Sequence, residues 1–164
     1  MSLLILTTGG TIDKLYFDAL SEYQIGDSVV ERLLRTARVA LPFRVAELMR
    51  KDSLELTDAD RQAIVDAVAA APETRIVITH GTDTMTDTAR ALAGAIAGVQ
   101  GKTVVLVGAL APARFAESDA SFNLGMAVAT AQVASPGVWI AMNGTVFDGA
   151  KVRKDRSINS FVPV

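Results

Sequence analysis

The sequence predicts an α/β domain built on a doubly wound, mainly parallel sheet with helices on both faces. Short apolar runs alternate along the chain with segments of helical pattern, and several of these runs carry almost no polar residue. A strand that is apolar on both sides needs a cover on both sides, which is typical of parallel sheets between helical layers. With 164 residues, the chain fits a single domain spanning 1–164.

The expected strands share a run of apolar, mostly branched residues that is bounded by glycine, proline or polar residues. They cover residues 3–6, 43–49, 75–79, 103–107 and 137–142. The run at 43–49 is the weakest of them.

Two of the expected helices carry a start signal. Ser28 with Glu31 and Thr57 with Asp60 each have the spacing of a capping box, in which side chains satisfy the first backbone N–H groups of a helix. Pro72 stops the second, alanine-rich helix. The expected helices cover residues 28–38, 57–71, 84–96 and 122–133.

Two segments lack a clear pattern. Residues 13–26 join two elements, and we expect a loop that is poorly ordered without ligand and closes as a lid. From Asn143 the chain becomes polar, and we expect a loop or a short hairpin over 148–160.

Composition and charge exclude several function classes. Sixteen basic residues against 18 acidic ones give a net charge of −2 without a basic stripe, which disfavours nucleic acid as a partner. The chain has no cysteine, which removes thiol nucleophiles, disulfides and thiolate metal sites. The apolar start is too short to span a membrane and lacks the features of a signal peptide, so we expect a cytoplasmic protein without a membrane partner.

Glycine- and threonine-rich segments follow the predicted strands at 7–11, 80–84, 108–112 and 143–145. In doubly wound sheets, ligands bind beyond the carboxyl ends of the strands, where these segments lie. The dinucleotide, P-loop and serine-elbow motifs are all missing. The single histidine, His80, cannot form a multi-histidine metal site, and we expect it to be hydrogen-bonded into the domain. What remains is hydroxyl chemistry with lysine or tyrosine as proton acceptor, for which Thr11 after two glycines is the first candidate, although Gly9-Gly10-Thr11 alone also fits a simple turn.

Taken together, the segments resemble a known family. TTGGTID at 7–13 and THGTDTMTDTA at 79–89 are similar to the two signature motifs of the bacterial L-asparaginase family. Further segments follow in the same order: 21–26 resembles its tyrosine loop, 51–53 its substrate-contacting serine turn, 107–110 its Val-Gly-Ala-Met segment, and Asp148-Gly149 with Lys154 its catalytic-lysine loop. The similarity extends over nearly the whole chain.

The resemblance assigns catalytic roles. It implies that Thr11 is the nucleophile that attacks a side-chain amide carbonyl, with Tyr23 hydrogen-bonded to it. It also implies a second catalytic group, formed by Thr82, Asp83 and Lys154, that passes protons and positions the attacking water.

The resemblance also assigns substrate contacts, and it implies no metal and no cofactor. Ser53 and Asp83 would hold the α-carboxylate and α-amino groups, and the Ala109 carbonyl would accept from the amide nitrogen. Backbone N–H groups near Thr11 and Thr82 would form an oxyanion hole. The implied substrate-binding residues are Gly10, Ser53, Gly81, Thr82, Asp83 and Ala109.

The implied activity is hydrolysis of L-asparagine to L-aspartate and ammonia through an acyl-enzyme. Two alternatives stay open: a catalytically weak amino-acid-binding module of the same fold, and an amidase acting on glutamine or a larger amide. One methylene is worth only about 1–3 kcal/mol of discrimination, so the sequence does not choose between the amides.

The family's C-terminal domain, with the acid that it supplies to a neighbouring site, has no counterpart in this sequence. We therefore expect only the N-terminal catalytic domain, working as a homo-oligomer, either a dimer or a tetramer. Candidates to replace the missing acid from a second copy are Glu22, Glu117 and Asp119.

Overall fold

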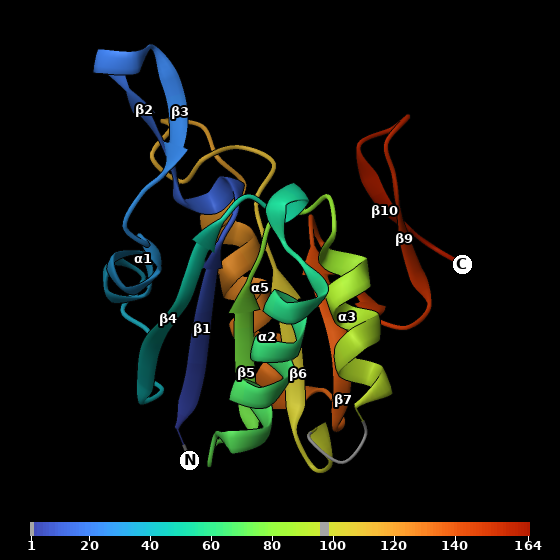
Figure 1. The fold of residues 1–164 in the computed structure, drawn as a ribbon. Coiled ribbons are helices and arrows are strands. Elements are labelled where there is room, and N and C mark those ends of the chain that lie inside the picture. The colour runs from blue at the N-terminus through green and yellow to red at the C-terminus, as the bar shows by residue number, and fades with distance from the viewer. Residues whose placement is uncertain (1, 96–98) are drawn as a thin grey trace.

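The computed structural model describes residues 2–95 and 99–164, and it confirms the predicted α/β fold. A six-stranded sheet has the order β4-β1-β5-β6-β7-β8 (Figure 1). Neighbouring strands pair in parallel except β8, which runs antiparallel to β7. The strands are β1 (Leu3–Gly9), β4 (Phe43–Lys51), β5 (Arg75–Thr79), β6 (Thr103–Val107), β7 (Gly137–Met142) and β8 (Thr145–Asp148).

Helices cover both faces of this sheet, as predicted. They are α1 (Val30–Thr36), α2 (Asp58–Ala70), α3 (Met85–Gly94) and α5 (Ala120–Val133). Because side chains alternate along a strand, neighbours such as Leu3 and Leu4 enter different layers. Leu4 joins the core formed with α2 and α3, whereas Leu3 joins the core formed with α1 and α5. The predicted end of the third helix at Ile96 lies outside the described residues.

One of the two predicted capping boxes is confirmed. The Thr57 hydroxyl accepts from the Asp60 N–H at 3.2 Å, and the Asp60 carboxylate accepts from the Thr57 N–H at 2.8 Å. These reciprocal bonds satisfy donors at the start of α2, which begins at Asp58.

The predicted box of Ser28 and Glu31 is wrong. Helix α1 begins at Val30 without a side-chain cap of this kind, and Glu31 instead pairs with Arg35 one turn later at 2.6 Å. The Val29 N–H donates to the buried carboxylate of Asp13 at 2.9 Å. The Ser28 hydroxyl accepts from the Val30 N–H at 3.3 Å, so neither bond of the predicted box is present.

Two hairpins stand outside the main sheet, where the sequence predicted irregular segments. The segment 13–26, expected to be a loop, contains the antiparallel strands β2 (Lys14–Phe17) and β3 (Glu22–Ile25). The polar tail forms the short hairpin that was one of its two predicted forms, with β9 (Val152–Asp155) and β10 (Ser160–Pro163). Figure 1 shows β2–β3 projecting beyond the carboxyl end of β1, and β9–β10 lying beside α3. Within the described ranges, no helix is long and apolar enough to cross a membrane.

Candidate active site

The segments that follow β1, β4 and β5 pack closely because glycines leave room for backbone contact. A Cβ on Gly10, whose φ is +84°, would lie 2.5 Å from the Gly81 nitrogen. A Cβ on Gly81 would lie 2.6 Å from the Ser53 Cβ. Both distances are too short for any side chain, so only glycine fits at these positions. The glycines predicted to bind substrate thus first bring Thr11, Ser53 and Thr82 into one place.

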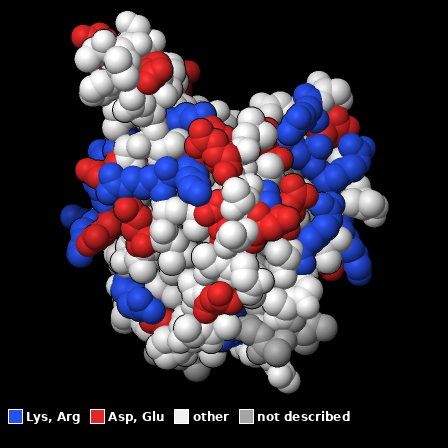
Figure 2. All heavy atoms as spheres, viewed as in Figure 1, with Lys and Arg blue, Asp and Glu red and all other residues white. Residues whose placement is uncertain are grey.

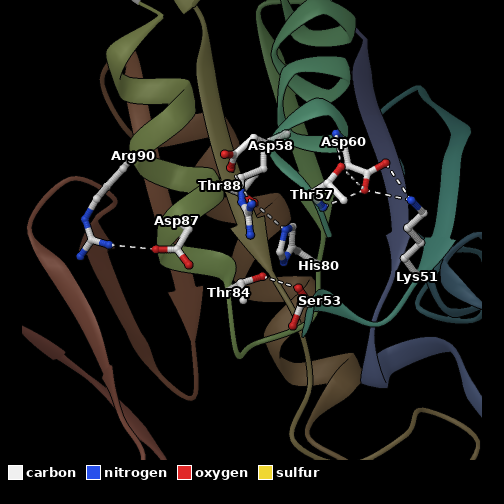
Figure 3. A network of polar contacts seen from close by, with 11 residues as sticks. Lys51, Ser53, Thr57, Asp58, Asp60, His80, Thr84, Asp87, Thr88 and Arg90 are labelled. Carbon is white, nitrogen blue, oxygen red and sulfur yellow. Dashed lines mark hydrogen bonds and ion pairs between the residues drawn. The ribbon is translucent and has the colours of Figure 1, made fainter. Parts of the chain in front are cut away.

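The serine turn is fixed to the start of α3. The Thr84 hydroxyl donates to the Ser53 carbonyl at 2.7 Å (Figure 3), and Ser53 is almost fully buried. The Asp52 carboxylate accepts from the Leu54 N–H at 3.1 Å, which stabilises the short 3₁₀ turn Ser53–Glu55. Ser53 therefore lies between the two signature segments.

The predicted second catalytic group is brought together by direct hydrogen bonds. Lys154 Nζ donates to Thr82 Oγ1 at 2.8 Å and to Asp83 Oδ1 at 2.7 Å. The Lys154 side chain is only 9% exposed. Its strand, β9, pairs with β10, where the register partner Phe161 is buried in the core under α3. This anchor holds a lysine from a polar segment against residues more than 70 positions earlier in the chain.

The predicted nucleophile and its tyrosine share an open cavity. Thr11 begins a short 3₁₀ turn, Thr11–Asp13, and is half-buried, whereas Tyr23 on β3 is 54% exposed. No hydrogen bond joins these two described residues, although the resemblance implies one; both line a cavity of about 360 Å³. The Tyr23 ring packs edge-on against Tyr16, with centroids 5.5 Å apart, and lies 6.0 Å from Phe115. The remaining lining residues are Lys14, Leu110, Pro112 and Phe115.

The segment around Ala109 is fixed by an acid whose role the sequence did not suggest. The Leu110 and Ala111 N–H groups each donate to the Asp119 carboxylate at 3.0 Å. Asp119 also accepts from the side-chain amides of Asn123 and Asn143, at 2.8 and 2.9 Å. These bonds engage its carboxylate within its own chain, which removes Asp119 as a candidate to reach a second copy. Ala109 itself is buried, as a residue at the base of a site should be.

The sequence also did not predict an ion pair made by Lys14, one of the residues that line this cavity. Lys14 and Asp52 form an ion pair of 3.0 Å that links the β2–β3 hairpin to the serine turn. Burial acts to raise the pKa of Asp52, but the Leu54 N–H and the Lys14 ammonium outweigh it and lower that pKa. Figure 2 shows basic and acidic side chains interspersed over the face of the molecule that is viewed in Figure 1. In residues 2–95 and 99–164, no group of three or more His, Cys, Asp or Glu side chains could hold a metal ion.

His80 is hydrogen-bonded into the domain, as predicted. Its ring is fully buried, with Nδ1 2.7 Å from the Gly81 carbonyl and Nε2 2.8 Å from the Thr88 hydroxyl (Figure 3). Burial lowers the pKa of His80 to about 4, so the ring is neutral near pH 7.

Comparison with known proteins gives a consistent result over the whole fold. The family model described as "Asparaginase, N-terminal" matches residues 2–161. "L-asparaginase 2" of Escherichia coli is 35% identical and aligns with 93% of this chain and 46% of its own length. "Glutaminase-asparaginase" of Acinetobacter glutaminasificans is 36% identical, aligning with 97% of this chain and 51% of its own length. The solved structure of the thermostable L-asparaginase from Thermococcus kodakarensis superposes with a TM-score of 0.84 at 28% identity, covering 100% of this chain and 51% of that one. The chain therefore spans about half the length of the curated relatives it matches.

Proposed function

The chain belongs to the asparaginase family, and from that premise we propose that it hydrolyses the side-chain amide of L-asparagine, releasing L-aspartate and ammonia. The observation that carries this proposal is the Thr82–Asp83–Lys154 group, assembled at 2.7 and 2.8 Å beside the loop that holds Thr11. A weak binding module would have no need for a buried lysine bonded to a threonine hydroxyl.

In the first step, the Thr11 hydroxyl attacks the amide carbon while the Tyr23 hydroxyl accepts its proton and releases its own toward the amide nitrogen. The C–O bond forms and the carbonyl oxygen becomes an oxyanion, which backbone N–H groups near Thr11 and Thr82 stabilise. The intermediate then expels the amide nitrogen, which leaves as ammonia with the proton from Tyr23. An acyl-enzyme ester on Thr11 remains.

In the second step, water attacks this ester and regenerates Thr11. The proton of the water passes through the Thr82 hydroxyl to the uncharged Lys154 amine, 2.8 Å away, and returns to the leaving oxygen of Thr11. The attacking oxygen forms the new C–O bond as the ester bond to Thr11 breaks, and aspartate leaves. Asp83 holds the lysine in place at 2.7 Å.

Substrate orientation follows from the surrounding segments. Ser53 and Asp83 hold the α-carboxylate and α-amino groups, and the Ala109 carbonyl accepts from the amide nitrogen. Gly10 and Gly81 let the backbone approach the substrate closely.

The assembled protein is proposed to be a homo-oligomer, with a dimer as its smallest active unit. A second copy would shield the open side of the cavity and supply an acid to the α-amino group, for which Glu22 and Glu117 remain candidates. Light scattering with activity measured across a dilution series tests this, and full activity as a monomer would contradict it. A cytoplasmic location stays a prediction from the sequence.

Steady-state ammonia release from asparagine and glutamine, measured side by side, tests the proposed function. We expect turnover of asparagine that exceeds turnover of glutamine. Comparable turnover of both would favour a glutaminase-asparaginase, a candidate supported by the similarity to the Acinetobacter enzyme. Tight binding of aspartate without ammonia release would favour the binding module instead.

A further inference from the structure

The buried ring of His80 touches the active-site backbone, although the proposed reaction does not use it. Its Nδ1 lies 2.7 Å from the carbonyl oxygen of the next residue, Gly81. Its Nε2 lies 2.8 Å from the hydroxyl of Thr88, which is one turn inside α3. The ring therefore links the start of α3 to the peptide between Gly81 and Thr82.

The hydrogen-bond partners fix where the proton of the ring lies. The Gly81 carbonyl can only accept, so Nδ1 carries the hydrogen and donates it. A neutral imidazole has one N–H, so Nε2 is then an acceptor and Thr88 donates its hydroxyl hydrogen. Both ring nitrogens are satisfied in this arrangement.

The Nδ1–H bond orients a peptide group at the site. The described peptide bonds are all trans, so the Thr82 N–H points opposite to the Gly81 carbonyl, away from the buried ring. Gly81 itself lies against Gly10 and Ser53, which belong to the site. The Thr82 N–H has no acceptor among the residues that the structure describes. It is therefore a donor directed at the site with its hydrogen-bonding capacity unused.

We propose that His80 is a positioning residue, whose Nδ1–H holds the Gly81–Thr82 peptide so that the Thr82 N–H donates to the developing oxyanion. This role rests on the proposed function. It assigns to Thr88 the task of keeping the hydrogen on Nδ1. Loss of one preorganised oxyanion donor lowers kcat by about 10²–10³ in other enzymes. The tautomer of His80 matters because a ring with its hydrogen on Nε2 could not donate from Nδ1 to the Gly81 carbonyl.

Two substitutions of His80 separate its two contacts. The side-chain amide of His80→Asn is close to Nδ1 in reach and can still donate to Gly81. The longer His80→Gln reaches toward Thr88, as Nε2 does, and loses the donor to Gly81. We expect kcat to fall about a hundredfold in His80→Gln with little change in KM, and about tenfold or less in His80→Asn.

Thr88→Val tests the same contact with a smaller change in shape. It removes the hydroxyl that donates to Nε2, and we expect kcat to fall about tenfold. Thr86→Val is the matched control, because Thr86 is a mostly buried threonine of the same helix with no hydrogen-bonded partner among the described residues. We expect it to keep wild-type kcat. Aspartate binding by calorimetry verifies that each variant folds.

The tautomer can be observed directly because His80 is the only histidine in the chain. Selective ¹⁵N labelling should show the hydrogen on Nδ1 in the wild type, and a loss of this preference in Thr88→Val. A hydrogen on Nε2 in the wild type, or equal kcat in the Asn and Gln variants, overturns the positioning role alone. No ammonia release by the wild type overturns the proposed function, and this role with it.

Discussion

The proposed site has two halves, an assembled half formed by Lys154, Thr82 and Asp83 and an open half formed by Thr11 and Tyr23, and they differ in how completely their hydrogen bonds are made. Lys154 bonds to Thr82 and Asp83 at 2.8 and 2.7 Å with a side chain only 9% exposed. Tyr23 is 54% exposed and makes no hydrogen bond to Thr11 in the described structure. The first half is built from the segment after the inner strand β5 and a core-anchored hairpin. The second half is built from the turn after β1 and a projecting hairpin. We infer that the proton-passing half is ready before substrate arrives, whereas the nucleophile half is completed by closure.

The anchoring of the β2–β3 hairpin supports this difference. Arg114 holds its base, with Nη1 donating to the Asp13 carbonyl at 2.8 Å and Nη2 to the Asp27 carbonyl at 2.7 Å. Toward its tip, the hairpin has exposed aromatic contacts such as Tyr16 with Tyr23. Two short strands alone are marginally stable, and one such aromatic pair adds only about 0.5–1.5 kcal/mol. A fixed base and a weakly held tip are what a closing segment needs.

The largest expected effect comes from the open half. Thr11→Ala should lower ammonia release by about 10⁴-fold or more, because no acyl-enzyme can form. The free energy of unfolding should fall by only about 1 kcal/mol, since Thr11 is half-buried and at a turn. Steady-state kinetics and denaturant unfolding measure both quantities. Near wild-type hydrolysis of asparagine by the purified variant would show that the nucleophile is another residue.

Replacement of Lys154, in the assembled half, should lower activity and stability together. Lys154→Met should lower kcat by about 10³-fold and reduce the free energy of unfolding by about 2 kcal/mol, because it removes the hydrogen bonds to the Thr82 hydroxyl and to the Asp83 carboxylate. Lys151→Met is the matched control on the same loop, where an exposed ion pair of 3.7 Å with Asp148 is lost. We expect that control to stay within about 0.5 kcal/mol and to keep full activity. Equal behaviour of the two variants would contradict the assembled half.

Tyr23→Phe should reduce activity without reducing stability. We expect kcat to fall about a hundredfold, the contribution of one general base, while the aromatic contacts persist. Tyr16→Phe is the control, because Tyr16 is the register partner of Tyr23 and similarly exposed. If both variants lose activity equally, the hairpin contributes by covering the site, and the Tyr23 hydroxyl has no role of its own.

The last expected effect concerns the pH dependence of stability and comes from His80, which is buried behind the Lys154–Thr82–Asp83 group. Burial lowers the folded pKa of His80 to about 4 from its ordinary value of 6.5. The hydrogen bond to Gly81 and the charge of Asp87 oppose this shift, and the charge of Arg61 adds to it. Below pH 6.5 the unfolded chain binds a proton that the folded chain does not, so stability is full above pH 6.5 and declines toward pH 4. The loss is about 3 kcal/mol. Urea unfolding of wild type and His80→Gln at pH 7 and pH 4.5 should show a steeper decline for the wild type, and parallel declines would contradict it.

Three strands of the main sheet could be predicted from the sequence to the residue, whereas the other predicted strands and helices differ from the structure at their ends. The strands at 75–79, 103–107 and 137–142 have the predicted bounds, because an apolar run covered on both faces has no other stable place. The β2–β3 hairpin could not be predicted from the sequence, because its turn has no Asn-Gly or Asp-Gly signal. Ser21 adopts the left-handed conformation there instead. The Ser28–Glu31 box failed because the Ser28 hydroxyl accepts from the Val30 N–H and Glu31 pairs with Arg35 instead.

The site was predictable only in part for a similar reason. Spacing alone gave Thr11 as a candidate, whereas Lys154 and Tyr23 came from the family resemblance, because nothing local marks a surface-type lysine as buried. Lys14 and Asp119 were missed in their present roles, since an ion pair across two loops and an acid bonded to backbone N–H groups depend on tertiary contacts. Both side chains can be read from the sequence, but their hydrogen-bond and ion-pair partners depend on the tertiary fold.

Hydrogen exchange measured with and without aspartate tests the difference between the two halves most directly. Exchange at His80, whose N–H donates to the Val107 carbonyl at 2.9 Å, and in the paired strand 152–155 should be slow without ligand and change little when aspartate binds. Exchange over 14–25 should be fast without ligand and slow strongly on binding, as the hairpin closes over Thr11. Slow exchange of the hairpin without ligand, or ligand protection confined to 80–84 and 152–155, would contradict the inference that substrate completes the nucleophile half.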